Sequence, residues 1–273
     1  MRSLLLWAAP CRRTTSITAR DMKKTVIRPW AVAFWLLVWQ GGSMALSAAY
    51  PHGALLLASP LSALARLGEL AVTAAFWRAV AASAVRILGG FLLSCAAAVA
   101  LAALAARWRA VRELLAPLVA VVKAVPVVSF IILTLVWLDG RILPLFISAL
   151  MVFPPVYLNV LQGILAADRQ LLEMARVFRV PFRRTLWGMW LPQVLPYFRA
   201  ASSLALGLCW KAGVAAEVIG LPSGTVGERL YMAKVYFQTP DLFAWTAVIV
   251  AVSVLFERLF LAGVDLLVRK AGG

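Results

Sequence analysis

Residues 167–198 read ADRQLLEMARVFRVPFRRTLWGMWLPQVLPYF, a basic and amphipathic stretch between two long apolar segments. Proline suits the first turn of a helix but breaks a helix interior, so Pro181 divides the stretch into two short helices. Apolar side chains share one surface of the first helix, whereas arginines keep the connection hydrated. We therefore predict a helical hairpin over 164–194. A hairpin lying against lipid headgroups has a similar pattern, and composition alone does not separate the two.

The segments around the hairpin are apolar enough to cross a membrane. The chain is 63% hydrophobic and 14% charged with a mean hydropathy of +0.91, which exceeds what a soluble domain of this size can bury. Because a helix needs roughly 20 apolar residues to cross the hydrocarbon core, we predict an all-α integral membrane protein with about six spans. The candidate spans are 29–48, 83–106, 114–138, 142–163, 195–218 and 242–263.

The basic residues predict how these spans are oriented. Nineteen of the 27 Lys and Arg residues fall on the hairpin's side when Arg199 and Arg258, inside their spans near that side, are counted with it. Five fall on the other side, and the remaining three lie within spans. Cytoplasmic segments carry such an excess, so the hairpin and both termini are predicted to be cytoplasmic. With this hydropathy, the net charge of +16 is interpreted as membrane anchoring and not as a nucleic-acid footprint.

The first 28 residues form a basic leader without a clear cleavage site. Met22 opens a sequence more typical of a membrane-protein start, so residues 1–21 are interpreted as an over-extended start, with a disordered tail as the alternative. The transmembrane domain is predicted to cover 29–273.

Few residues are suited to covalent chemistry or to binding a metal. A lone His52 excludes a histidine-based metal cluster and a Ser-His-Asp triad in this chain. Three cysteines (Cys11, Cys95 and Cys209) cannot form a paired framework, and two of them lie in apolar segments as small hydrophobic residues. The chain also lacks a Gly-x-x-x-x-Gly-Lys-Ser/Thr phosphate loop. We therefore expect no catalytic residue, metal or cofactor here.

A motif in the hairpin resembles that of a known transporter family. Glu173, Met174 and Ala175 are followed by Leu191 and Pro192, eighteen residues after the glutamate. This spacing resembles the Glu-Ala-Ala signature of permease subunits of ATP-binding cassette importers. The surrounding sequence, from about residue 61 to 267, is similar to the nitrate, sulfonate, taurine and thiamine-precursor branch of that family.

The signature departs from the family pattern at two positions: Met174 replaces one alanine, and Arg179 replaces the usual glycine, which is the more serious departure. Glycine permits a left-handed turn that costs other residues about 1 kcal/mol or more. Either Arg179 is strained, or the turn shifts to Val180 and Pro181, and we favour the shifted turn. Pro181 and Pro192 are expected to fix the corners of the hairpin, and Glu173 is expected to pair with a hairpin arginine or to cap a partner.

The resemblance implies the MetI-like fold of type I importer permeases, in a multi-pass protein of the bacterial inner membrane. It implies that the permease dimerises, that a separate ATP-binding cassette subunit hydrolyses ATP, and that an extracytoplasmic binding protein delivers the substrate. A homodimer is expected because one chain offers six spans and no evident internal repeat. The residues expected to couple to the ATPase are Glu173, Met174, Ala175, Arg179, Pro181, Leu191 and Pro192.

Polar residues inside predicted spans are the candidates for a substrate pathway or gate. A central lysine costs roughly 2.5–3.5 kcal/mol on insertion scales, so Lys123 warrants a functional hypothesis. It lies three residues before Pro126, which should bend the helix into a pore-lining kink. The alternative is that Lys123 extends to the cytoplasmic interface. Ser129 is a further candidate, with interhelical packing as its alternative.

Two more candidates, Lys211 and Glu217, lie in the fifth predicted span, and their spacing places them on different faces of a helix. Glu217 is either part of an outer gate or simply hydrated. If Lys123 lines the pathway, it favours an anionic substrate, and the resemblance implies a small anion, a sulfonate or a vitamin precursor. A self-contained secondary transporter and a membrane scaffold remain the alternative functions. The first of these normally needs midplane carboxylates and repeats, which this sequence does not show.

Overall fold

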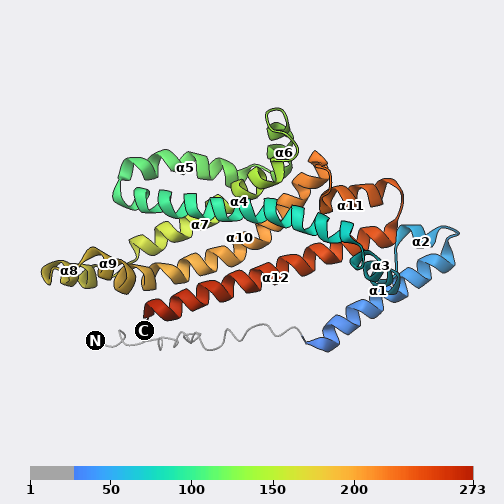
Figure 1. Ribbon diagram of the computed structural model, residues 1–273, viewed down its shortest axis with the longest axis horizontal. Helices are drawn as coiled ribbons and strands as arrows, with labels where there is room; N and C mark the ends of the chain where they lie inside the picture. Colours follow the sequence, from blue (N-terminus) through green and yellow to red (C-terminus); the bar gives the residue numbers. More distant parts are fainter. Residues whose placement is uncertain (1–27, 273) are drawn as a thin grey trace, which may run out of the picture.

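The computed structural model describes residues 28–272, and every regular element in that range is helical (Figure 1). The helices, in chain order, are α1 (Pro29–Ala49), α2 (Gly53–Leu56), α3 (Pro60–Ala71), α4 (Ala74–Arg107), α5 (Arg109–Ala124), α6 (Val127–Leu135), α7 (Leu143–Leu165), α8 (Arg169–Val177), α9 (Phe182–Thr185), the π-helical turn η1 (Leu186–Trp190), α10 (Leu191–Gly220), α11 (Val226–Val235) and α12 (Thr239–Gly272). The predictions for residues 1–21 and Cys11 lie outside the described residues.

The predicted membrane spans correspond to long apolar helices. Within residues 28–272, five helical runs are long and apolar enough to cross a membrane: α1, α4, α7, α12 and the continuous run from α9 into α10. The predicted span 114–138 is broken into α5 and α6, which meet at 103°. The prediction of about six spans is therefore confirmed if the broken pair counts as one.

The second span is longer than its apolar core indicated. Helix α4 begins at Ala74, nine residues before the predicted start at 83, and residues 74–82 continue directly into the span. Thr73 caps this helix, its side chain accepting a hydrogen bond from the Phe76 N–H at 3.3 Å. At 1.5 Å per residue, the 34 residues of α4 extend about 51 Å, so the helix projects beyond the hydrocarbon core.

Helix α7 lies between α4 and α10, and these three helices build the main core. Small residues permit the close approach. A side chain at Gly90 on α4 would place its Cβ 2.3 Å from the Leu145 carbonyl oxygen, and one at Gly213 on α10 would lie 2.5 Å from Ser148 Oγ. The core residues that are buried most completely include Ile87, Phe91, Val152, Val156, Tyr157 and Leu206.

The two ends of the molecule are built differently. The α8–α9 hairpin and the last turns of α12 lie at one end, whereas α2, α3 and α11 gather at the other (Figure 1). A separate buried cluster, Phe76, Ala79, Val226, Trp245 and Val248, joins α4, α11 and α12 at the second end. Cys95 and Cys209 are buried and free, as expected of small hydrophobic residues.

Replacing Gly213 by alanine should destabilise the fold. The added methyl group meets Ser148 and Ile87 at 2.5–2.6 Å, and overpacking of this kind costs about 1–3 kcal/mol. Thermal unfolding of the detergent-solubilised protein should show a lower midpoint for Gly213→Ala. The matched control is Gly207→Ala on the same helix, where no atom lies within 4 Å of the added carbon. Equal midpoints for the two variants would show that the helices do not approach as described.

Candidate functional site

The base of the hairpin is fixed by side chains at both of its ends. The Asp168 side chain caps α8 by accepting hydrogen bonds from the N–H groups of Gln170 at 2.8 Å and Leu171 at 3.4 Å. The Asp168 N–H in turn donates to Gln193 Oε1 at 2.7 Å, and Gln193 Nε2 donates to the Met189 carbonyl at 2.9 Å. Because Gln193 belongs to the first turn of α10, the start of α8 is tied to the start of the following span.

The turn between α8 and α9 corrects the prediction of a shifted turn. Arg179 itself adopts the left-handed conformation, with φ of 51°. Its N–H donates to the Arg176 carbonyl at 3.1 Å, and the Val180 N–H donates to the Ala175 carbonyl at 2.9 Å. These two bonds form a Schellman motif, which satisfies the last carbonyls of α8. The turn therefore keeps the geometry of a glycine turn even though an arginine occupies the position.

The second expected corner, at Pro192, is also corrected. Pro181 does separate the two short helices, because it precedes α9 with φ of −60° and ψ of 142°. Pro192 instead lies in the first turn of α10, and the chain is helical without interruption from Phe182 to Gly220. The π-helical turn η1, closed by the Leu191 N–H on the Leu186 carbonyl, joins α9 to α10. Only one corner of the hairpin is therefore set by proline.

The exposed surface of the hairpin carries large apolar side chains among charged ones. Phe178 and Phe182, on either side of the turn, are 74% and 73% exposed, and Met174 and Glu173 are also exposed. Ala175 is buried, so it packs inward. Glu173 forms no ion pair with a hairpin arginine or with any other basic residue within 28–272. The exposed arginines of the hairpin are Arg169, Arg176, Arg179, Arg183 and Arg184.

The broken span places three candidate residues around one bend. The residue before a proline is disfavoured in the helical region, and Val125 accordingly adopts an extended conformation with ψ of 133°. Lys123 lies in the last turn of α5 just before the break, and Ser129 lies in the first turn of α6 just after it. Both side chains are exposed. The bend predicted at Pro126 is confirmed.

The two candidates on α10, Lys211 and Glu217, lie in opposite environments. Lys211 is exposed and forms no ion pair with any residue of the described chain, and it adjoins Ala212, which packs in the cluster joining α6, α7 and α10. Glu217 is fully buried, so the hydrated alternative for this residue is wrong. Its Oε2 accepts a hydrogen bond from Ser83 Oγ at 2.8 Å. Ser83 was not predicted as a partner of Glu217, because 134 residues separate the two in the sequence.

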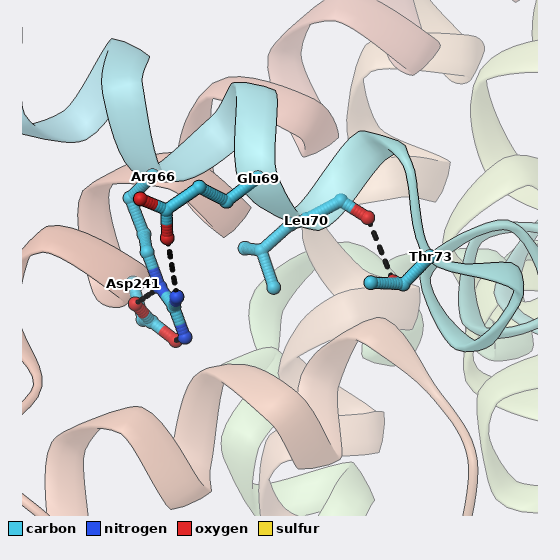
Figure 2. A network of polar contacts seen from close by, with 5 residues as sticks. All are labelled: Arg66, Glu69, Leu70, Thr73 and Asp241. Atoms are coloured by element: carbon cyan, nitrogen blue, oxygen red, sulfur yellow. Dashed lines mark hydrogen bonds and ion pairs between the residues drawn. The ribbon is translucent and has the colours of Figure 1, made fainter.

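A network of polar contacts at the end opposite the hairpin was also not predicted from the sequence (Figure 2). Arg66 on α3 donates from Nε to Asp241 Oδ1 at 2.5 Å and from Nη1 to Glu69 Oε2 at 2.7 Å. Hydrogen bonds to these two carboxylates raise the pKa of Arg66 above its ordinary value, so the guanidinium stays charged. Because Asp241 opens α12, the network joins α3 to α12. Thr73 Oγ1 donates to the Leu70 carbonyl at 2.7 Å and closes the end of α3.

Comparison with known proteins decides the family. Residues 97–272 match the family described as the binding-protein-dependent transport system inner membrane component. The chain belongs to this family. The matched region contains the hairpin, the broken span and most of the core, which are the parts of the fold that the resemblance singled out.

Relatives of this permease cover most of both chains. A probable ABC transporter permease protein of Brucella melitensis is 29% identical over 77% of this chain and 85% of its own length. The aliphatic sulfonates transport permease protein SsuC of Bacillus subtilis is 28% identical over 91% and 86%. The taurine transport system permease protein TauC of Escherichia coli is 24% identical over 93% and 89%.

The protein is accordingly a multi-pass inner-membrane permease subunit of an ATP-binding cassette importer. This assignment sets aside the secondary transporter and the membrane scaffold. Members of the family work with an ATPase and a substrate-binding protein. The permease is a transporter subunit.

Replacing Arg179 by glycine should tighten the hairpin turn. Glycine removes the cost of the left-handed conformation, about 1 kcal/mol, and the hydrogen bonds of the turn involve the backbone only. Amide hydrogen exchange over residues 169–185 should slow severalfold in Arg179→Gly. The matched control, Arg176→Gly, places glycine inside α8, where it costs roughly 0.5–1 kcal/mol and should speed the same exchange. Faster exchange in both variants would contradict this reading of the turn.

Proposed function

We propose that the 164–194 hairpin couples this permease to its ATPase subunit. The observation that carries the proposal is the exposed apolar face of Met174, Phe178 and Phe182 on a hairpin whose base is tied to a membrane span. An amphipathic helix of this kind fits a hydrophobic groove on a soluble partner. The tether through Gln193 would pass rigid-body motion of the hairpin directly to α10.

The exposed carboxylate of Glu173 supports the same proposal. It adjoins the apolar face and has no basic partner in the described part of the chain, so a cationic or amide group of the ATPase can pair with it. ATP binding and hydrolysis belong to that partner in this proposal. The cytoplasmic position of the hairpin follows from the distribution of Lys and Arg and is part of the proposal.

We further propose that two copies of the permease enclose the substrate pathway. The bend between α5 and α6 leaves backbone groups of residues 125–126 outside a helix, and membrane proteins tolerate this where the segment is buried in protein or lines a wet cavity. Lys123 and Ser129 flank the bend with exposed side chains. A second copy facing this bend would place both residues beside a shared pathway.

Two exposed lysines, Lys123 and Lys211, support a small anion as the substrate. Three relatives have names that agree with an anionic substrate: they are named for the transport of aliphatic sulfonates, taurine and bicarbonate. A fourth relative is named for riboflavin transport, so an anionic substrate is the proposal that the lysines and three of these four relatives favour. The substrate would reach the permease from an extracytoplasmic binding protein at the end that holds α3 and α11.

Replacing Glu173 by lysine should separate the ATPase from the permease. The change reverses the charge beside the apolar face without altering any contact within the described chain. Affinity purification of the tagged permease from native membranes in mild detergent should recover the ATPase with the wild type and lose at least nine-tenths of it with Glu173→Lys. The matched control is Glu113→Lys, an exposed carboxylate on α5 that forms only an i, i+4 pair with Arg109. Full recovery of the ATPase by Glu173→Lys would overturn the proposed coupling site.

Replacing Lys123 by glutamine should reduce transport of an anion. Loss of the charge removes attraction for the substrate at the bend, whereas Lys123→Arg retains it. Uptake of labelled taurine, an alkanesulfonate or bicarbonate into proteoliposomes containing the complete importer should fall about tenfold in Lys123→Gln for the substrate that the wild type accepts. Exposed Arg141, in the turn before α7, provides the control Arg141→Gln. Unchanged uptake by Lys123→Gln would remove this lysine from the pathway.

A further inference from the structure

The amino terminus of α11 is held by groups from three different elements. The Val226 N–H donates to Ser83 Oγ on α4 at 2.9 Å, and the Gly227 N–H donates to Glu217 Oε2 on α10 at 3.0 Å. The Glu228 N–H donates to Thr225 Oγ1, the cap of α11 itself, at 3.2 Å. The first N–H groups of a helix have no partner within the helix and carry its positive end, so a carboxyl group is a favourable partner for them.

Glu217 is the centre of this arrangement. Its side chain is 0% exposed, and its Oε2 receives both the Gly227 N–H and the hydroxyl of Ser83. The approach is close enough that a side chain at Gly227 would place its Cβ 2.2 Å from Glu217 Cβ. Position 227 therefore needs glycine for packing, and α4, α10 and α11 meet at one carboxyl oxygen. We call Ser83, Glu217 and the Val226 and Gly227 amides the α11 clamp.

The second oxygen of the carboxyl group indicates what the clamp does. Glu217 Oε1 is buried and has no hydrogen-bond partner among the described residues, and the same is true of Arg86 Nη1. Arg86 lies one turn after Ser83 on α4, and its charge acts on Glu217 although the two form no ion pair. Arg86 as a whole is half-buried, but a buried carboxyl oxygen and a guanidinium nitrogen without access to solvent are costly to leave unpaired.

We propose that Glu217 is a positioning residue of the gate at the end opposite the hairpin, and that it exchanges the α11 amides for Arg86 when this gate opens. The proposal rests on the proposed importer function. With α11 docked, Glu217 binds the start of that helix. When α11 leaves, the carboxyl group turns to Arg86, which gives the buried carboxylate a charged partner. Two arrangements that are each satisfied form a two-state element of the kind that switching proteins use.

The position of the clamp links it to the rest of the transport cycle. Glu217 lies three residues before Gly220, the end of the helical run that begins at Phe182 beside the hairpin turn, so motion of the hairpin reaches it through one continuous helix. Ser83 and Arg86 lie on α4, which contacts α10 directly here through the hydrogen bond from Ser83 Oγ to Glu217 Oε2. A shift of α10 relative to α4 therefore changes which partner lies nearest to the Glu217 carboxyl group.

Hydrogen exchange on the complete importer tests the proposal. The permease, ATPase and binding protein, reconstituted in nanodiscs, are compared at rest and trapped with ATP and vanadate. We expect the amides of residues 222–235 to exchange at least fivefold faster in the trapped state. Ser83→Ala should produce this fast exchange already at rest. Ser203→Ala, which removes a serine–glutamate bond of 2.6 Å between α10 and α12, should leave the exchange of α11 unchanged.

The Arg86→Gln variant distinguishes a role of Arg86 in the gate from a merely structural role. Arg86 forms no hydrogen bond or ion pair with residues 28–272 in the resting arrangement, so the variant should leave resting exchange of α11 as in the wild type. ATP hydrolysis stimulated by the binding protein should nevertheless fall about tenfold. Arg78→Gln, an exposed arginine on the same helix, should retain full stimulation.

Two results would overturn the proposal: equal exchange of α11 at rest and in the trapped state, or normal stimulation in Arg86→Gln. If Ser83→Ala does not assemble, the Arg86→Gln result still decides between the outcomes. Failure of the importer proposal would look different, because the ATPase would then not co-purify with the wild-type permease. An intact complex whose α11 does not respond to ATP would overturn the clamp alone.

Discussion

The close contact of α7 with α4 and α10 is the interaction on which the rest of the structure depends. Gly90 and Gly213 allow it by leaving room for the Leu145 carbonyl group and the Ser148 hydroxyl. In lipid, helices gain little from hiding apolar surface against each other, so packing at this distance supplies much of their association. The three packed helices carry the hairpin at one end and Glu217 at the other. Both features therefore keep a fixed spacing.

Hydrogen bonding of the backbone explains where the chain departs from straight spans. A membrane offers no water to an exposed N–H or carbonyl group, so each interruption must find its own partners. The Schellman bonds around Arg179 satisfy the end of α8 in the hairpin, outside the spans, and Ser83 and Glu217 bind the first N–H groups of α11. The break at residues 125–126 is hydrogen-bonded within its own backbone and is flanked by the exposed side chains of Lys123 and Ser129. It is our candidate for the pathway.

Sequence reasoning succeeded where a short-range physical rule decides the structure. Hydropathy located the spans, Pro181 the hairpin corner and Pro126 the bend, because each depends on a few neighbouring residues. It failed where distant partners outweigh a local preference. The left-handed cost at Arg179 is about 1 kcal/mol, and two backbone hydrogen bonds outweigh it. Glu217 appeared free to be hydrated because Ser83 is remote in sequence, and the pairing of Arg66 with Asp241 spans 175 residues.

The uninterrupted helix from Phe182 to Gly220 has a consequence for how the sequence can vary. Its 39 residues cover about 58 Å, and each residue turns the helix by about 100°. The direction in which Glu217 points is thus locked in phase with the face that the hairpin presents at the far end. One residue gained or lost between Pro192 and Glu217 would turn these two faces apart by more than a quarter of a revolution. The number of residues in this segment is therefore physically constrained, independently of which side chains face the lipid.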